Sequence, residues 1–424
     1  MKTALVLPAA AALLLWPAFL NGYPLVFADT GTYLSQAINH YLGWDRPAFY
    51  SFFMLPLHLT ITTWPVIAVQ SLMACWVLAL TGRLLIARWH PWMLLALTAG
   101  AAVLTALPWT VSELSPDFLT ALMVLSLVVL LVAPAWLSVV ERTGLVLLIT
   151  FAIAAHLSNL PLAVVLLIVL LPWRRSLAPW AAIALGVFAL MSVNVVAGRG
   201  FAISPYGNVF LLARVIADGP GRDALVRNCP EAGWMLCPYV SDLTDNADEF
   251  LWDSQGPLGA VGGAKRVSPE AGAIIASAIS AEPMREAEAF VSNGMIQAIL
   301  FETGDGLHPW PTEVTPWVER DFPAAEIRRY DAARQTQGMS LLPVWLMRLH
   351  EAVALIGLLG CLVLAARRKT ASSVRIAVCA VLIGIVANAF ICGGLSGPHD
   401  RYQSRVMWLP GAVAALALAG RREV

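Results

Sequence analysis

Residues 341–369 read LLPVWLMRLHEAVALIGLLGCLVLAARRK, an apolar run that ends in three basic residues. A transmembrane helix needs about 20 mainly apolar residues, and the segment 341–366 meets this requirement. Lys and Arg accumulate on the cytoplasmic side of membrane proteins. The basic residues 367–369 therefore predict that this end of the helix faces the cytoplasm, and the same pattern recurs along the chain.

The composition of the whole chain is that of a membrane protein. Of its 424 residues, 59% are hydrophobic and 13% are charged, against about 25% charged in soluble proteins. The formal net charge is zero, and no basic excess indicates nucleic-acid binding. We therefore predict an all-α polytopic membrane protein with about ten transmembrane helices, some of them short. The candidate segments are 3–20, 48–82, 92–108, 116–134, 143–156, 158–172, 177–197, 341–366, 373–393 and 404–420.

Two of these regions are expected to break. The stretch 46–83 is too long for one straight span, so we expect an interfacial or re-entrant piece near 47–59 and a span from about Thr63. The stretch 143–172 is expected to form a hairpin of two short spans around a polar joint at 156–159. The first apolar run lacks a clear small-residue cleavage site, and we interpret it as a retained span.

The charged residues sort by predicted side of the membrane. The expected cytoplasmic turns carry Arg83, Arg88, Arg142, Arg174, Arg175, Arg367, Arg368, Lys369, Arg421 and Arg422. The other face is expected to carry most of the acidic clusters and a few arginines. This distribution predicts a multi-pass protein of the cytoplasmic (inner) membrane, with its active site on the non-cytoplasmic, periplasmic side.

Composition divides the chain into three parts. Residues 1–197 are expected to form a transmembrane bundle with a catalytic first outside loop at 21–47. Residues 198–340 are expected to form one large, mainly helical, non-cytoplasmic segment, and 341–424 to form three closing spans. Cys229 and Cys237 lie in the outside segment. In an oxidising compartment they form either a disulfide or two free thiols.

The first candidate site residue is Asp29, which follows an apolar run and is expected at the membrane–water boundary. Partial desolvation there would raise the pKa of its carboxyl and improve it as a base. The structural alternative makes Asp29 the N-cap of a helix that begins at Thr30. The same loop continues to Asp45 and Arg46.

A second cluster contains Glu113 and Asp117. Ser115 and Pro116 are a typical helix start, and an acidic residue is favourable in the first helical turn, which by itself explains Asp117. Glu113 lies outside that helix. It is interpreted as a second acid, a metal ligand or a hydrogen-bond acceptor.

The third cluster enters the last span. Arg401 and Arg405 are one helical turn apart, and the guanidinium fork matches the oxygens of a phosphate or diphosphate. The alternative is that both side chains snorkel to the interface. His399 precedes the pair. His156, at the joint of the two short spans, is either a structural residue or a further substrate contact.

Several of these motifs together resemble the polytopic GT-C class of glycosyltransferases. The resemblance rests on Asp29 followed by Tyr33, on Arg-Pro-Ala-Phe-Tyr at 46–50, on Ser-Pro-Asp-Phe-Leu at 115–119 and on Arg-Tyr at 401–402. The layout of short middle spans and one large outside segment is also similar. The chain differs from many members in having Asp-Thr where they have Asp-Glu, and a single proline where a double proline is common.

The resemblance implies an inverting transferase that uses a polyprenyl-phosphate-linked sugar, with Asp29 as the general base and Arg401 facing the lipid phosphate. A glycan, lipid or protein would be the acceptor, and membrane lipids would surround the enzyme. No metal ligands are predicted, and participation of a divalent cation stays open. The predicted substrate-binding residues are Tyr33, Asp45, Arg46, Glu113, Asp117, His156, His399, Arg401 and Arg405.

Three other functions compete with this reading. A lipid-linked oligosaccharide ligase or polymerase would use the same face and similar arginines. A transporter or flippase would carry polar residues in mid-span and paired broken helices. The predicted spans carry almost no such residues, with Gln70, Asn194 and Asn388 as the main exceptions, and this scarcity disfavours transport. A structural assembly factor would bind a partner through the outside segment.

Overall fold

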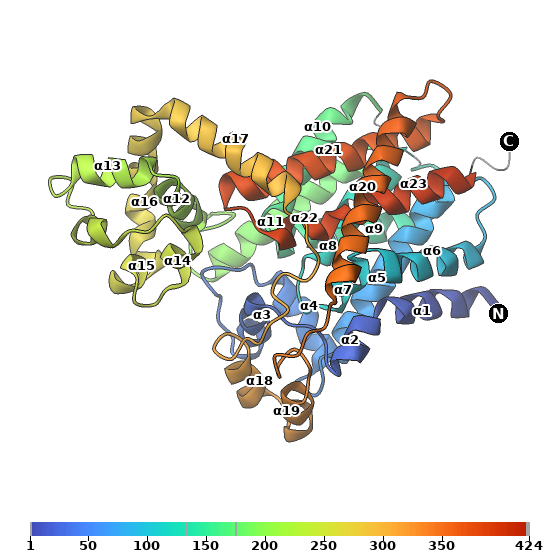
Figure 1. The fold of residues 1–424 in the computed structure, drawn as a ribbon, viewed down its shortest axis with the longest axis horizontal. Coiled ribbons are helices and arrows are strands. Elements are labelled where there is room, and N and C mark those ends of the chain that lie inside the picture. Colours follow the sequence, from blue (N-terminus) through green and yellow to red (C-terminus); the bar gives the residue numbers. More distant parts are fainter. Residues whose placement is uncertain (1, 133, 174–175, 421–424) are drawn as a thin grey trace. The chain divides into compact units, whose positions relative to one another are not determined.

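The computed structural model describes residues 2–132, 134–173 and 176–420, and over these residues the regular structure is helical apart from one isolated β-bridge (Figure 1). The predicted all-α class is confirmed. Four helices are long and apolar enough to cross a membrane by length and composition. They are α5 (Trp64–Leu85), α11 (Ala178–Val196), α20 (Val344–Ala366) and α21 (Ser372–Leu395).

The remaining predicted spans correspond to shorter helices. They are α1 (Lys2–Leu14) with α2 (Trp16–Asn21), α6 (Pro91–Leu104) with α7 (Leu107–Ser112), α8 (Phe118–Val132), α9 (Val139–Ala155), α10 (Asn159–Val169), and α22 (Asp400–Met407) with α23 (Leu409–Ala419). In each of the three pairs a proline, Pro17, Pro108 or Pro410, lies in the first turn of the second helix. Proline cannot continue the preceding helix, which explains these breaks.

Both predicted interruptions are confirmed. The piece near 47–59 is α4 (Phe49–His58), and it is separate from α5. Helices α9 and α10 are separated at residues 156–158. Of the basic residues expected on the cytoplasmic face, Arg174, Arg175, Arg421 and Arg422 lie outside the described residues.

Helix α8 forms the centre of the bundle. Every residue of Phe118–Val132 is buried, and α8 packs against α5, α9, α10 and α22. A helix that is apolar on all sides is expected to be enclosed by others. Its first turn follows directly on Asp117, so this carboxylate lies at one end of a helix whose residues are all buried.

The chain forms two compact units. The first contains Met1–Phe188, Phe301–Ala387 and Asp400–Val424, and the second contains Ala189–Leu300 and Asn388–His399. The segment 198–340 is thus divided: its last part, with α18 (Thr315–Asp321) and α19 (Ala324–Asp331), belongs to the first unit. The three-part organisation by membrane side stays a prediction.

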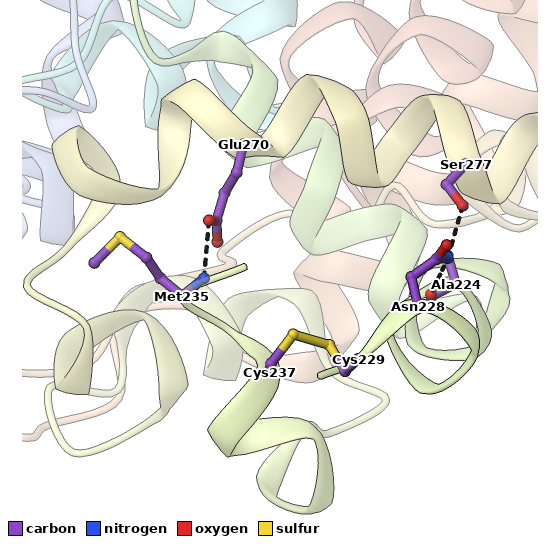
Figure 2. Close-up of a disulfide and its surroundings, with 7 residues drawn as sticks. All are labelled: Ala224, Asn228, Cys229, Met235, Cys237, Glu270 and Ser277. Atoms are coloured by element: carbon purple, nitrogen blue, oxygen red, sulfur yellow. Dashed lines mark hydrogen bonds between the residues drawn. A yellow bond between two sulfur atoms is a disulfide. The ribbon is translucent and has the colours of Figure 1, made fainter. Parts of the chain in front are cut away.

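The second unit is built from short helices and one disulfide. The helices are α12 (Gly207–Ala217), α13 (Pro220–Asn228), α14 (Ala247–Trp252), α15 (Pro257–Ala260), α16 (Ala264–Ala281) and α17 (Pro283–Ile299). Cys229 and Cys237 are bonded, so of the two alternatives the disulfide is confirmed. Figure 2 shows it beside α16, where Glu270 accepts a hydrogen bond of 2.9 Å from the backbone N of Met235.

Candidate active site

The first outside loop is fastened to the segment before α8 by its backbone. The backbone N of Leu25 donates to the carbonyl of Ser112 at 2.9 Å, and the backbone N of Leu114 donates to the carbonyl of Leu25 at 2.8 Å. The Thr30 hydroxyl donates to the carbonyl of Leu114 at 3.0 Å. Two acidic clusters that are far apart in the sequence are therefore held side by side.

Two buried glutamines complete this frame. Gln70 in α5 donates to the carbonyls of Val111 at 3.0 Å and Glu113 at 2.8 Å. Gln335 accepts from the backbone N of Val26 at 3.1 Å and donates to its carbonyl at 2.7 Å. Gln70 thus has a structural explanation inside the bundle and is not evidence of a transport path.

Asp29 lies in the first turn of α3 (Ala28–Ile38), one residue past its start, so the N-cap alternative is wrong. The hydrogen bond at the start of α3 is made by Thr30, whose hydroxyl accepts from the backbone N of Phe27 at 2.9 Å. The Asp29 carboxylate instead binds two arginines. Its Oδ1 lies 2.7 Å from Arg46 Nη2, and its Oδ2 lies 3.3 Å from Arg401 Nη1.

Asp117 combines a local and a long-range role. Its backbone N donates to the Ser115 hydroxyl at 3.3 Å just before α8 begins, as the helix-start motif predicts. Its carboxylate also binds the C-terminal arginines: Oδ1 lies 2.7 Å from Arg405 Nη1, and Oδ2 lies 3.4 Å from Arg401 Nε. The helix-start account of Asp117 is therefore incomplete.

Arg405 is buried and holds three protein side chains through its two terminal nitrogens. Its side chain is 1% exposed. Besides Asp117, it contacts His156 Nε2 at 3.1 Å and donates to the Ser158 hydroxyl at 3.1 Å. His156 Nε2 also lies 3.4 Å from Asp117 Oδ1, and its Nδ1 lies 2.9 Å from Ser158 Oγ. Arg405 therefore positions Asp117 and the α9–α10 joint.

Arg401 lies between the two aspartates, and its contacts are longer. They measure 3.3–3.4 Å, against 2.7 Å for the Arg46–Asp29 and Arg405–Asp117 pairs. Its guanidinium stacks on the Phe27 ring, 3.8 Å from the centroid. Its backbone N donates to Asp305 at 3.1 Å. Arg401 is thus oriented from several sides without being tightly paired by either carboxylate.

Asp117, Arg401 and Arg405 line a cavity in the first unit, whereas Asp29 and Arg46 are not among its lining residues. Its polar wall is formed by Glu113, Asp117, Asp305, Arg401 and Arg405. A second, mainly apolar cavity adjoins it, because Ala106, Thr303 and Ser404 line both. The apolar part of the second wall is formed by Phe301, Val353, Ala354, Met407, Trp408 and Gly411.

The two acids differ in electrostatic state. Burial alone raises the pKa of Asp29, but the guanidiniums of Arg46 and Arg401 outweigh it, so the pKa lies below its ordinary value. The predicted rise in the pKa of Asp29 is therefore wrong: desolvation is present, but two cations oppose it. Burial, reinforced by the negative charge of Asp117, raises the pKa of Glu113 to about 8.

The other predicted site residues take different places. Tyr33 is 2% exposed and packs edge-on against Tyr50, with ring centroids 4.9 Å apart. The backbone carbonyl of Asp45 accepts a hydrogen bond of 3.2 Å from Arg46 Nη1. His399 belongs to the second unit, where its Nε2 lies 3.2 Å from Asp248. Among the described residues, no group of three or more His, Cys, Asp and Glu side chains has an arrangement that could hold a metal ion.

Sequence reasoning missed Asp305, Ser158 and Gln335. Ser158 belongs to the polar joint at 156–159, from which only His156 was predicted as a site residue. Asp305 follows Gly304, whose φ of +104° favours glycine and marks a tight turn. That Thr-Gly-Asp-Gly stretch was an available turn signal. Gln335 had none, because an amide is ordinary in a polar segment.

The comparisons with known proteins give little further. No family model and no curated protein matches this chain. The chain is similar to the crystal structure of ArnT from Cupriavidus metallidurans bound to undecaprenyl phosphate, with 15% identity, a TM-score of 0.35, and coverage of 99% of this chain and 78% of that one. So low a TM-score gives no basis for assigning to this chain the ligand or activity of ArnT.

Proposed function

We propose that this chain is an inverting membrane glycosyltransferase that moves a sugar from a polyprenyl-phosphate-linked donor to an acceptor hydroxyl. The proposal is carried by one observation: Arg401, held between Asp29 and Asp117, lines a polar cavity that adjoins an apolar one. The polar wall matches the anionic head group of a lipid-linked sugar phosphate. The apolar tail stays in the membrane, because the apolar cavity, at about 10 Å³, is far smaller than a polyprenyl chain.

The three arginines differ in the length of their contacts with the carboxylates, and this difference supports the assignment. The contacts of Arg401 are long, so its guanidinium can turn to phosphate oxygens at little cost in hydrogen bonding. Arg405 and Arg46 each keep a 2.7 Å contact with one carboxylate. We therefore propose Arg401 as the phosphate ligand, and Arg46 and Arg405 as residues that position Asp29 and Asp117.

The reaction follows from these roles. The acceptor oxygen forms a bond to the anomeric carbon, and the bond from that carbon to the phosphate oxygen breaks. The acceptor proton moves to the Asp29 carboxylate. The bonding electron pair leaves with the polyprenyl phosphate, whose charge Arg401 stabilises.

The lowered pKa of Asp29 is compatible with a base in the loaded enzyme. It keeps the carboxylate ionised before substrate binds. When a phosphate engages Arg401, part of the positive charge beside Asp29 is neutralised, and the pKa of Asp29 rises. Glu113, whose pKa is raised to about 8, is the competing proton acceptor at this site.

The disulfide supports a site on the oxidising side of the membrane. Disulfides persist in the periplasm and outside the cell, so the second unit, which holds Cys229–Cys237, is proposed to lie there. This unit also contains the last residues of the candidate span α21, which ends at Leu395. Only a short connection separates Leu395, at the end of α21, from Asp400, where α22 begins, and Arg401 lies in the first turn of α22. Arg401 is thus proposed to face the periplasm, in a protein of the inner membrane.

The experiment is transfer by the full chain reconstituted in liposomes, with radiolabelled polyprenyl-phosphate sugars and acceptor extracts. We expect Asp29→Asn and Arg401→Ala to lose transfer while Arg320→Ala, which changes an exposed side chain outside the cavity, keeps it. Wild-type rates in both correctly inserted variants would remove the proposed roles. Transfer of whole oligosaccharides would favour the ligase or polymerase. Movement of an intact donor across the bilayer without transfer would favour the flippase.

A further inference from the structure

Helix α17 has two faces of opposite kind. Its buried face contains Glu286, Gly294 and Gln297. Gln297 is joined to the backbone of His399, donating to its carbonyl at 2.7 Å and accepting from its N at 2.9 Å. The Phe290 ring packs against Phe390 of α21, with centroids 6.0 Å apart.

The contact with α21 is close and specific. A Cβ added to Gly393 would lie 2.4 Å from the carbonyl oxygen of Asn293, so only glycine permits this approach. Helix α21 is one of the candidate spans, and it ends at Leu395. The C-terminal half of α17 is therefore fixed beside the end of a membrane span, where the apolar core of a bilayer gives way to head groups.

The exposed face of α17 changes character along its length. Near its start it carries Arg285, which pairs with Asp223 and Glu282, and Glu288. Residues 289–299 contain no charged side chain. Over this half the exposed apolar side chains are Val291 (51%), Met295 (58%), Ile296 (43%) and Ile299 (74%), and Ser292 is also exposed. Positions 291, 295 and 299 are four apart and form one stripe along the helix.

We propose that the C-terminal half of α17 inserts its apolar stripe into the membrane interface beside the end of α21, while its charged N-terminal half stays in water. An amphipathic helix of this kind buries its apolar face at the boundary between head groups and acyl chains. The change from charged to apolar residues falls where α17 meets the span, which is the order that a bilayer edge imposes. The inference concerns a lipid contact and is independent of the proposed transferase activity.

A protein partner fits the stripe less well. Protein–protein hot spots are enriched in Trp, Tyr and Arg, whereas this stripe is aliphatic apart from one methionine. Binding of a second copy of the chain, or of another protein, would also not explain why the stripe lies beside the end of a span. Both the position of the stripe and its composition favour lipid as the occupant.

The test uses spin labels on the full chain reconstituted in vesicles of phosphatidylcholine with a minor share of phosphatidylglycerol. Labels are placed at Met295→Cys and Ile299→Cys, with Glu288→Cys on the same helix as the matched control and the unsubstituted chain as background. Accessibility is measured to oxygen, which partitions into lipid, and to a water-soluble nickel chelate.

We expect a several-fold higher ratio of oxygen to nickel accessibility at 295 and 299 than at 288. Equal, nickel-dominated accessibility at all three positions would mean that the stripe lies in water, and the proposal would fail. Low accessibility to both reagents at 295 and 299 would mean that protein covers the stripe, which also overturns it. A melting temperature close to that of the unsubstituted chain shows that each labelled variant is folded.

Discussion

Arg401 and Asp29 are 372 positions apart in the sequence, yet Arg401 Nη1 lies 3.3 Å from Asp29 Oδ2. The same guanidinium reaches Asp117 through Nε at 3.4 Å. One residue of α22 thus joins the two acidic clusters, which come from separate loops. The chemistry that we propose depends on this three-residue arrangement, and the following predictions test its parts.

Asp29→Asn is expected to lower the rate of sugar transfer by about 10²–10⁴-fold, the usual contribution of a positioned acid–base group. The amide keeps the size of the side chain but cannot take the acceptor proton. Rates are compared in liposomes at saturating donor. Asp331→Asn, an exposed aspartate at the end of α19, is the matched control and is expected to transfer at the wild-type rate. Equal rates for the two variants would refute the role of Asp29.

Glu113→Gln is expected to change the pH dependence of stability. The pKa of Glu113 is about 8 in the folded chain and about 4.3 in an unfolded one. The folded state therefore binds more protons between these values, and the contribution of this group to stability falls as the pH rises. The glutamine of the variant does not ionise, so its stability does not fall with pH in this way. The variant is expected to be more stable than wild type at about pH 8, by at most about 5 kcal/mol, and equally stable near pH 4. Thermal unfolding in detergent at both pH values measures this.

The same variant separates the two candidate bases. If Asp29 is the proton acceptor, wild type and Glu113→Gln share one pH–rate profile, because the rise of the rate with pH then follows the ionisation of Asp29. With Glu113 as the acceptor, the wild-type rate rises as the pH approaches about 8, and the variant loses that limb with most of its activity. The profile of kcat/KM between these variants decides which carboxylate takes the proton.

Arg405→Met is expected to destabilise the protein by about 3–5 kcal/mol, because it leaves the buried Asp117 carboxylate without its 2.7 Å partner. Arg320→Met removes the exposed partner of Asp321 and is expected to lower the melting temperature much less, because water screens an exposed ion pair. A double variant, Arg405→Met with Asp117→Leu, should recover much of the loss. A single variant as stable as wild type would contradict the positioning role of Arg405.

Gln335→Ala is expected to destabilise the protein by about 1–3 kcal/mol, since it leaves the buried N and carbonyl of Val26 without partners. It should also weaken transfer, because Val26 is three residues before Asp29. Gln337→Ala is the control, since its side chain is exposed and donates only to the carbonyl of Asp331 among the bonds described. Matching stability in the two variants would show that Gln335 does not hold the loop.

Much of the fold was predictable because its signals are local. Hydropathy located the apolar helices, and the length of 46–83 and the polar joint at 156–159 located two breaks. The residue pair Ser115-Pro116 marked the start of α8. Local signals failed where a helix start depends on context, as at Asp29, which lies in the first turn of α3 and not at its N-cap.

The sequence by itself determined the class of the protein and the residue types available to a site, because hydropathy and helix-start preferences act over a few neighbouring residues. Only the tertiary structure decided which arginine binds which aspartate. It also decided that the pKa of Asp29 is lowered and that of Glu113 raised. The reason is physical: the pKa of a carboxyl depends on burial and on charges within a few ångströms. Folding sets Arg46 of the same loop against Asp29 and brings Arg401 to it from 372 positions away.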